Sequence, residues 1–330
     1  MVNSNSQSPQ ITHLFRPLNL LIIGVTMYLL RWGLLKPMLG FISKQVDLEL
    51  ESQIPEIWFA LLVLSVILIA AGGYIINDIK DVNTDAHNHG KNPVGSLISS
   101  DQAYLLYQIT TISGLILGFG IGFHFGNYNF GIIQLTGAIS LWFYSYYFKT
   151  ELLIGNLIVA FMVALVPLTV GIYEVSLIQN FYISQITKFK DFNFNFVAFW
   201  FLGYTAFVFL ITWIRELIKD VEDLEGDRKS GARTLPIQWG VKTAKVIITL
   251  LYLVVLAGIH IVRGEYLTDQ ISLIFILLII LMILFNIITI WMNKTILMSW
   301  SSWNKLLSIV GIIYLIALGY IINNELFFNV

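Results

Sequence analysis

The sequence contains no cysteine and is poor in charged residues. Asp, Glu, Lys and Arg make up only 12% of its 330 residues, against about a quarter of a typical soluble domain. The absence of cysteine excludes disulfides, thiolate nucleophiles, iron–sulfur clusters and cysteine-ligated zinc. The net charge is −1 and no cluster of basic residues stands out, so nothing indicates nucleic acid as a partner.

Most of the chain is apolar. Hydrophobic residues make up 57% of it and the mean hydropathy is +0.78, which predicts an all-α, polytopic membrane protein. We expect one transmembrane domain over residues 1–330, with residues 1–13 as a polar tail that lacks the basic region of a cleavable signal peptide. A span needs roughly 20 mostly apolar residues. The nine segments that qualify lie near residues 18–39, 57–76, 102–124, 129–148, 152–175, 196–216, 243–262, 270–292 and 304–323.

The lysines and arginines predict the orientation. With the N-terminus inside, thirteen of the 19 fall at inside connections, five at outside connections, and Arg31 within the first span. This excess follows the positive-inside rule, so we expect a cytoplasmic N-terminus in the inner membrane of a bacterial cell. Arg31 needs a partner or a water-filled cavity at that depth.

Two clusters of acidic residues follow two of the expected spans. In each cluster three aspartates stand at positions i, i+3 and i+7, which places their carboxylates on one face of a helix. Both clusters fall at inside connections in the predicted topology. The first comprises Asn77, Asp78, Asp81 and Asp85, and the second comprises Asp220, Asp223 and Asp227.

The duplicated spacing predicts one shared site for a strongly cationic ligand. Carboxylates this close repel one another unless a cation neutralises them. Mg²⁺ usually takes one or two carboxylates and keeps its other positions for water and phosphate oxygens, so two facing clusters suit Mg²⁺ ions that bridge to a diphosphate. The alternative is that the aspartates are solvated loop residues. That alternative explains either cluster alone equally well, but it does not account for two matched copies.

Basic side chains at the inside connections suit the same ligand. Ammonium and guanidinium groups could hold a diphosphate and stabilise it as a leaving group, although the positive-inside rule also explains their presence. Lys149 is the strongest candidate, because it stands alone beside a cluster of tyrosines that begins at Tyr144. The others are Lys91, Arg228, Lys229 and Arg233.

Aromatic residues and two histidines are weaker signals. The chain has 9 Trp, 15 Tyr and 23 Phe. An allylic cation formed by loss of diphosphate would be stabilised over aromatic faces in a dry cavity, although packing and lipid contact explain most of these residues. His87 and His89 flank the first cluster and could ligate metal, but a solvated loop explains them more simply.

A divalent-cation channel or transporter is an alternative from a different class. Such a protein would place ionisable residues near the middle of the bilayer, whereas both acidic clusters fall at the ends of expected spans. The sequence therefore favours an enzyme with a capped site at the inside face of the membrane.

Five stretches of the sequence resemble the UbiA superfamily of intramembrane prenyltransferases. The resemblance runs through residues 14–325. Asn77-Asp78-x-x-Asp81-x-x-x-Asp85 resembles the first aspartate-rich motif of the family, and Asp220-x-x-Asp223-x-x-x-Asp227 resembles the second. The other stretches are Arg16-Pro17-Leu18-Asn19, similar to the start of the first helix, Tyr144 to Lys149 with Leu153-Ile154-Gly155-Asn156, similar to the inter-motif loop, and Arg228 to Pro236, similar to the segment after the second motif.

The resemblance implies a fold, a reaction and a set of roles. It implies nine transmembrane helices around a central cavity with a cytoplasmic cap. It also implies Mg²⁺-dependent transfer of a prenyl group from a polyprenyl diphosphate to a lipophilic or membrane-bound acceptor. Under it, Lys149, Tyr144, Asp81 and Asp223 are catalytic. The metal ligands are Asn77, Asp78, Asp81, Asp85, Asp220, Asp223 and Asp227, and the diphosphate ligands are Asn77, Lys91, Lys149, Arg228, Lys229 and Asn19.

The sequence departs from the family at one point. Where the family often has an Arg-Pro pair after the first motif, this chain reads Lys91-Asn92-Pro93, and Lys91 cannot give the bidentate contact of a guanidinium. The motifs most resemble those of bacterial and archaeal geranylgeranylglycerol-phosphate geranylgeranyltransferases, so an isoprenoid lipid precursor is the expected acceptor. An aromatic quinone precursor is the alternative. Membrane lipids are expected partners, and no obligatory protein partner is evident.

Overall fold

The computed structural model of the protein describes residues 12–87, 92–186 and 194–326. Among these residues it contains helices and their connections, with two isolated β-bridges and no strand. The expected all-helical fold is thereby confirmed. In chain order the elements are α1 (Thr12–Phe15), α2 (Pro17–Leu29), the π-helix η1 (Leu30–Leu35), α3 (Lys36–Val46), α4 (Glu56–His87), α5 (Ser100–His124), α6 (Phe130–Phe143), the π-helix η2 (Tyr144–Phe148), α7 (Ile154–Ile186), α8 (Asn195–Glu222), α9 (Leu224–Ser230), α10 (Leu235–Gln238), α11 (Val241–Glu265), α12 (Gln270–Trp291) and α13 (Trp300–Asn323).

Eight segments in the described part of the chain are helices long and apolar enough to cross a membrane. They are α2 joined to η1 and α3, and α4, α5, α7, α8, α11, α12 and α13. The remaining expected span, near residues 129–148, folds as the 14-residue helix α6 followed by the five-residue π-helix η2. The expectation of about nine membrane helices is confirmed in this approximate form, and the chain is a multi-pass membrane protein.

The first acidic cluster lies on a helix, as its spacing predicted, and this helix extends beyond the end of the apolar run. The helix α4 continues to His87, well beyond residue 76. Hydropathy marks where the apolar run ends, whereas a helix continues as long as its backbone hydrogen bonds do. Residues 77–87 contain no glycine or proline to interrupt them. Asp78 and Asp81 are therefore held on a regular helix.

The helices form two compact units. One contains residues 1–25 and 56–149, and the other contains residues 26–55 and 150–330, so α2 passes from the first unit to the second. The first unit carries α1, α4, α5, α6, η2 and the first acidic cluster. The second unit carries η1, α3, α7 to α13 and the second cluster. The expectation of a single domain stays a prediction.

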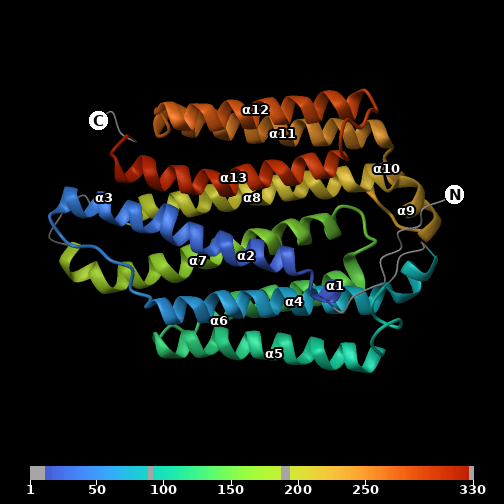
Figure 1. The fold of residues 1–330 in the computed structure, drawn as a ribbon, viewed down its shortest axis with the longest axis horizontal. Coiled ribbons are helices and arrows are strands. Elements are labelled where there is room, and N and C mark those ends of the chain that lie inside the picture. Colours follow the sequence, from blue (N-terminus) through green and yellow to red (C-terminus); the bar gives the residue numbers. More distant parts are fainter. Residues whose placement is uncertain (1–11, 88–91, 187–193, 327–330) are drawn as a thin grey trace. The chain divides into compact units, whose positions relative to one another are not determined.

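In the first unit, α4 packs along α5 and α6 (Figure 1). Small residues bring α4 and α5 close together. The Ser65 hydroxyl donates to the Gly114 carbonyl oxygen at 2.7 Å, and a Cβ at Gly114 would lie 2.9 Å from the Ser65 carbonyl oxygen. Contacts of this kind associate helices in lipid, where the hydrophobic effect does not drive them together. They fix the helix that carries the first acidic cluster.

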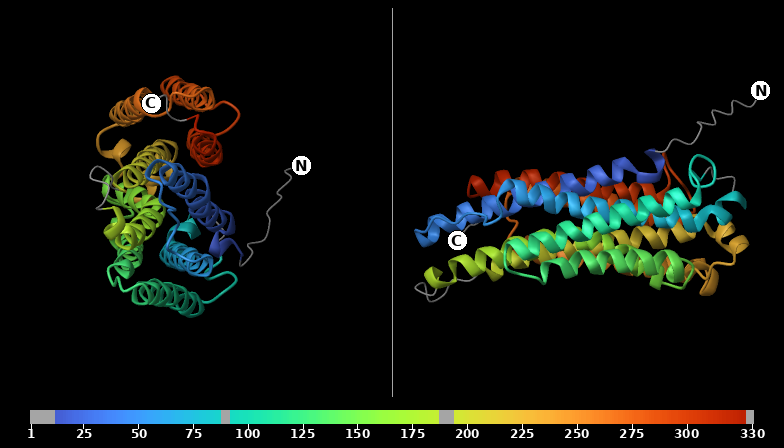
Figure 2. Two further views of the ribbon diagram at one scale, coloured as in Figure 1. Left: turned by 90° about the vertical axis from the view of Figure 1, so that its left-hand side faces the viewer. Right: turned by 90° about the horizontal axis from the view of Figure 1, so that it is seen from below.

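In the second unit, α13 packs against α8, α12, η1 and α3 (Figure 2). Gly33 of η1 lies against the backbone of α13, because a Cβ there would lie 3.0 Å from the Leu315 carbonyl carbon and nearer still to its oxygen. Asn304 of α13 accepts a hydrogen bond from the Tyr252 hydroxyl of α11 at 2.9 Å and donates one to the Ile211 carbonyl oxygen of α8 at 2.8 Å. These contacts hold α8, which leads into the second acidic cluster.

Arg31, in the first membrane helix, has Glu174 of α7 as its partner. Both side chains are buried, and Arg31 Nη1 lies 3.1 Å from Glu174 Oε1. Arg31 also donates to the Ser52 hydroxyl at 3.1 Å and to the Ile54 carbonyl oxygen, while the Ser52 hydroxyl donates to Glu174 at 2.7 Å. A charge at bilayer depth is tolerated when it is paired and hydrogen-bonded in this way. Of the two possibilities that the sequence left open, the structure shows a partner.

Candidate active site

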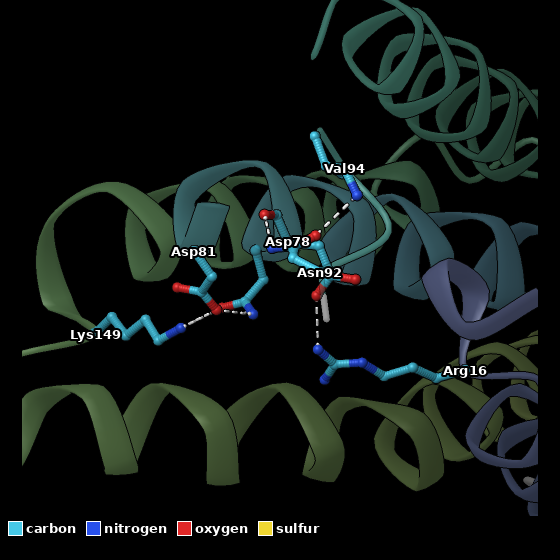
Figure 3. Close-up of polar contacts among 7 residues, drawn as sticks. Arg16, Asp78, Asp81, Asn92, Val94 and Lys149 are labelled. Carbon is cyan, nitrogen blue, oxygen red and sulfur yellow. Dashed lines mark hydrogen bonds and ion pairs between the residues drawn. The ribbon is translucent and has the colours of Figure 1, made fainter. Parts of the chain in front are cut away.

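Near its C-terminal end, α4 carries the described side chains of the first acidic cluster, which are those of Asn77, Asp78 and Asp81. Figure 3 shows Asp78 and Asp81 on this helix. Asn77 Nδ2 donates a hydrogen bond to Asp81 Oδ2, one turn further on, at 2.8 Å. The Lys149 ammonium group contacts the same Asp81 oxygen and lies 3.3 Å from the amide oxygen of Asn77. The structure therefore brings together three of the residues that the sequence singled out.

Lys149 reaches the cluster because the chain before it forms the π-helix η2. Its backbone N–H donates to the Tyr144 carbonyl oxygen at 3.0 Å, which is the i to i−5 bond of a π turn. Tyr146 holds this turn in place. The Lys80 ammonium lies 3.4 Å from the centroid of the Tyr146 ring, and the Tyr146 hydroxyl is 3.0 Å from that of Tyr104. Tyr144 contributes a backbone contact here, and the catalytic role expected for it stays a prediction.

Asp78 is paired with Arg16, a residue to which the motif spacing assigned no role. Arg16 Nη2 lies 2.8 Å from Asp78 Oδ1, and the guanidinium lies 4.8 Å from the ring centroid of Tyr74, one turn before Asp78 on α4. The partners are 62 residues apart in sequence, so no helical periodicity connects them. The available sequence signal was the Arg16-Pro17-Leu18-Asn19 stretch.

Asn92 stands where the resembling family often has arginine, and it binds backbone groups. Its Nδ2 donates to the Asp78 carbonyl oxygen at 2.7 Å, and its Oδ1 accepts from the Val94 backbone N–H at 2.9 Å. A neutral side chain thus joins the loop after α4 to the cluster helix. The guanidinium at the Asp78 carboxylate comes from Arg16 (Figure 3).

The second acidic cluster straddles a break between two helices, so the expectation that one helix carries its three aspartates is wrong. Asp220 lies in the last turn of α8, Asp223 forms the junction at its C-terminal end, and Asp227 lies on the short helix α9. Asn156, in the first turn of α7, donates to Asp220 Oδ2 at 2.8 Å. Burial, together with the charge of Asp223, raises the pKa of Asp227 above its usual range. A divalent cation at these carboxylates would favour their charged form and so oppose the rise in pKa that burial and the charge of Asp223 cause.

Glu222 lies within the second cluster in sequence but caps another helix. Its Oε1 accepts from the Ser301 backbone N–H at 3.1 Å, and its Oε2 accepts from the Ser301 hydroxyl at 2.5 Å. Ser301 lies in the first turn of α13, where N–H groups without partners in the helix attract a carboxylate. This contact separates Glu222 from the neighbouring aspartates in function.

The basic residues expected to bind diphosphate near the second cluster face solvent. Arg228 and Lys229 lie in the last turn of α9 and are exposed. Arg233 is also exposed, and its backbone N–H donates to the Thr150 carbonyl oxygen at 2.9 Å. The roles of Arg228 and Lys229 as diphosphate ligands stay predictions.

Several other expected ligands are described in part or not at all. Lys91 and His89 lie outside the described residues, and so do the side chains of Asp85 and His87, whose backbone belongs to α4. Asn19 lies half-buried in the first turn of α2. The expected binding roles of these residues stay predictions.

The donor atoms of the two clusters suit a hard divalent cation. They are carboxylate and amide oxygens, which Mg²⁺ prefers, with no thiolate in the chain. Within the described residues, no group of three or more His, Asp or Glu side chains gathers closely enough to hold a metal ion alone. Mg²⁺ usually takes one or two protein carboxylates and fills its other positions with water and substrate phosphate. The donors therefore fit Mg²⁺ held jointly by protein and diphosphate. The clusters belong to different units, and their meeting at one site stays a prediction.

Several known proteins resemble the chain in sequence. A family model described as the UbiA prenyltransferase family matches residues 48–309. A digeranylgeranylglyceryl phosphate synthase of Sulfolobus acidocaldarius is 33% identical over 202 residues, which are 60% of this chain and 64% of that relative. A synthase of the same name from Thermococcus sibiricus is 27% identical over 238 residues, 71% of this chain and 70% of that relative. The chain thus spans less than two thirds of the Sulfolobus relative.

Solved structures share the fold. A UbiA homolog from Archaeoglobus fulgidus, bound to DMAPP and Mg²⁺, has a TM-score of 0.60 at 18% identity, covering 94% of this chain and 98% of that one. The apo structure of a UbiA homolog from Aeropyrum pernix K1 has a TM-score of 0.60 at 13% identity, covering 96% of this chain and 99% of that one. At these identities the likeness establishes the fold.

Proposed function

The chain belongs to the UbiA prenyltransferase family, and from this we propose that it transfers a prenyl group from a polyprenyl diphosphate to a lipophilic acceptor, with Mg²⁺ as cofactor. The observation that supports this proposal most is the contact of Lys149 with Asp81 and Asn77. It places an ammonium donor, which suits a departing diphosphate, beside oxygen ligands that suit the metal ion of that diphosphate.

In the first step of the proposed reaction, the bond between the first prenyl carbon and the diphosphate oxygen breaks, and its electron pair leaves with the diphosphate. Bound Mg²⁺ would neutralise the charge that develops on that oxygen. Lys149 donates to the diphosphate and stabilises the same charge. The residues that would hold Mg²⁺ are Asn77, Asp78, Asp81 and Asp85 of the first cluster and Asp220, Asp223 and Asp227 of the second. Asn19, Lys91, Arg228 and Lys229 also bind the diphosphate.

In the second step, the prenyl carbon bonds to the acceptor nucleophile, and the proton of the acceptor passes to the released diphosphate. The apolar helices keep water from the prenyl cation, since water would capture it. Asn156 holds the Asp220 carboxylate in one orientation through their hydrogen bond, so the second cluster meets its ligand with less reorganisation. Tyr144 lies beside the diphosphate in this arrangement.

The acceptor that the relatives favour is a phosphate-bearing isoprenoid lipid. The relatives named above are digeranylgeranylglyceryl phosphate synthases, which corresponds to a geranylgeranyl diphosphate donor and a geranylgeranylglyceryl phosphate acceptor with a free hydroxyl. One structural neighbour was solved with GPP and Mg²⁺, which supports a prenyl diphosphate and magnesium in this chain too. The competing acceptor is the aromatic ring of a quinone precursor.

The charge distribution supports an orientation. Thirteen of the 19 lysines and arginines fall at inside connections when the N-terminus is inside. We therefore place the N-terminus and both acidic clusters at the cytoplasmic face of a bacterial cell membrane. The prenyl diphosphate would arrive from that face with its chain in the bilayer, so membrane lipids surround the enzyme and no obligatory protein partner is needed.

Diphosphate release by the purified protein tests the proposal. In lipid nanodiscs with geranylgeranyl diphosphate and geranylgeranylglyceryl phosphate, we expect release that requires Mg²⁺ and stops with a chelator. Mass spectrometry should detect the digeranylgeranyl product. A parallel reaction offers 4-hydroxybenzoate as acceptor. Transfer of the prenyl group to it would show that the acceptor is aromatic and not the isoprenoid lipid. The proposal would be overturned if neither product formed and no diphosphate were released in response to Mg²⁺. Such an outcome, with metal flux in sealed vesicles, would revive the transporter alternative.

A further inference from the structure

Two basic side chains pair with two carboxylates of the first cluster. Arg16 Nη2 lies 2.8 Å from Asp78 Oδ1, and the Lys149 ammonium contacts Asp81 Oδ2 (Figure 3). They come from segments on opposite sides of α4 in sequence, one before α2 and one after η2. Both reach one face of the same helix. The positions that a divalent cation would use are thus already neutralised by cations of the protein.

These cations are more exposed than the carboxylates they pair with. The side chains of Arg16 and Lys149 are 42% and 33% exposed, whereas those of Asp78 and Asp81 are 11% and 15% exposed. An ion pair contributes little to stability when both partners are exposed, but a buried carboxylate left without a cation is costly. The carboxylates are therefore held in place by the helix, and the more exposed cations can leave them when another cation takes their place.

The backbone of Arg16 is fixed, and its side chain contacts two groups of α4 at once. The Arg16 carbonyl oxygen accepts hydrogen bonds from the N–H groups of Asn19 at 2.9 Å and Leu20 at 3.3 Å, at the start of α2. Its guanidinium lies 4.8 Å from the Tyr74 ring centroid as well as against Asp78. An aromatic face attracts a guanidinium on its own. Arg16 can therefore give up the carboxylate and stay on the same face of α4.

We propose that Arg16 and Lys149 are internal counter-ions that occupy the metal positions of the first cluster and transfer to the diphosphate when it arrives with the metal. This inference rests on the proposed function. Metal alone would have to displace two cations and leave them unpaired beside its own charge. A diphosphate supplies the anionic oxygens that those cations need. Metal binding is therefore weak without diphosphate and strong with it, and Arg16 is a diphosphate ligand.

The first test measures this coupling in the unaltered protein. Isothermal titration calorimetry of the protein in nanodiscs gives the Mg²⁺ affinity with and without saturating inorganic diphosphate, after correction for the complex the two form in solution. Coupling between two sites usually amounts to about 5–150-fold in affinity. We expect saturating diphosphate to raise the Mg²⁺ affinity by at least about fivefold. A change below about twofold would overturn the counter-ion proposal.

The second test uses Arg16→Gln, which removes the guanidinium and keeps a polar side chain. We expect Mg²⁺ alone to bind at least about fivefold more tightly, because its competitor is gone, and inorganic diphosphate to bind more weakly. A residue that only supports the fold would weaken both, and a simple diphosphate ligand would leave metal affinity unchanged. Either of these results contradicts the proposal. Arg16→Lys keeps the charge without the fork geometry. Its affinities for Mg²⁺ and for diphosphate should lie between those of Arg16→Gln and those of the unaltered protein.

A control variant and an activity measurement separate this inference from the proposed function. Lys242→Gln removes one positive charge from an exposed position at the start of α11 and should leave both affinities as they are. If the unaltered protein releases diphosphate with Mg²⁺ but Arg16→Gln has ordinary metal affinity, the proposed function holds and the counter-ion proposal fails. If the unaltered protein binds neither Mg²⁺ nor diphosphate, the proposed function fails with it.

Discussion

The side chain of Asn156 in α7 donates a 2.8 Å hydrogen bond to the carboxylate of Asp220 in α8, 64 residues further along the chain. This bond makes Asn156 part of the second acidic cluster, although motif spacing alone places it elsewhere. Hydrogen bonds to charged groups contribute about 1.5–3 kcal/mol, so the partner of Asp220 matters for both its orientation and its stability.

Asn156→Ala should therefore raise the Mg²⁺ concentration needed for half-maximal diphosphate release and lower the free energy of unfolding by about 1.5–3 kcal/mol. The Asp220 carboxylate would lose its oriented donor. The matched control is Asn129→Ala, at an exposed residue before α6 whose side chain makes no capping hydrogen bond. Equal magnesium dependence in Asn156→Ala and the unaltered protein would show that the bond has no part in metal binding.

Lys149→Ala should lower turnover by about 10²–10³-fold, the usual effect of removing one preorganised electrostatic contact in the transition state. Thermal stability should change little, because the side chain is partly exposed and its pair with Asp81 is accessible to solvent. Single-turnover kinetics with geranylgeranyl diphosphate give the measurement, with Lys242→Ala as the control. Unchanged turnover would leave Lys149 as a topology signal only.

Asp81→Asn and Asp223→Asn keep the size of each side chain and remove its charge. Since Mg²⁺ prefers anionic oxygen, each change should abolish most activity and raise the magnesium requirement. If both carboxylates act on one diphosphate, the double variant should be scarcely slower than the slower single variant, as for residues that work as a unit. Diphosphate release across a magnesium series measures this. If the loss of activity in the double variant equalled the product of the two single losses, the two clusters would act at separate sites.

The buried pair of Arg31 and Glu174 should be sensitive to loss of one partner. Glu174→Gln removes the anion and keeps Arg31 charged at bilayer depth, which should cost about 3–5 kcal/mol of unfolding free energy. Combining Arg31→Met with Glu174→Leu removes both charges and should recover most of that loss. Unfolding in detergent reports both values. A double variant as unstable as Glu174→Gln would mean that packing, and not charge, sets the cost.

Gly33 and Gly40 offer a matched pair on one membrane helix. Gly33→Ala would press a Cβ into the carbonyl group of Leu315 and should destabilise the protein by about 1–3 kcal/mol. Gly40 has nothing within 4 Å of an added Cβ, so Gly40→Ala should be neutral or stabilise by about 0.5–1 kcal/mol through helix propensity. Thermal unfolding of the two variants should therefore move in different directions.

The sequence predicted the membrane helices well and their ends poorly. Long apolar runs mark membrane spans because the bilayer requires a segment to be both apolar and about 20 residues long. The continuation of α4 through Asp78 and Asp81 could not be seen from hydropathy, which changes at residue 76 while the backbone does not. The division of the stretch near 129–148 into α6 and η2 depends on how Tyr146 packs against Lys80 and Tyr104, which no local pattern encodes.

Within the candidate site, spacing found the aspartates but could not find their partners. Carboxylates at i, i+3 and i+7 share a face only where one helix carries them, as α4 carries Asp78 and Asp81. In the second cluster a helix break at Asp223 interrupts that pattern. Arg16 and Asn156 reach Asp78 and Asp220 through tertiary contacts, which leave no periodic trace. Spacing also could not show that Glu222, two residues from Asp220, is engaged with α13.

The π turn of η2 has a consequence for how this protein can change over evolution. A π turn holds one residue more than a regular helical turn, and each residue turns a helix by about 100°. Deleting one residue from the π turn Tyr144–Phe148 would restore the regular helix and leave Lys149 facing as it does now. Deleting one residue from Phe130–Phe143 would instead turn Lys149 by about 100° around the axis from Asp81. The connections after Lys149 can vary in length without this effect. Among descendants of this sequence, the number of residues from 130 to 143 should therefore stay constant, while the π turn can lose one residue and the connections on either side can gain and lose residues.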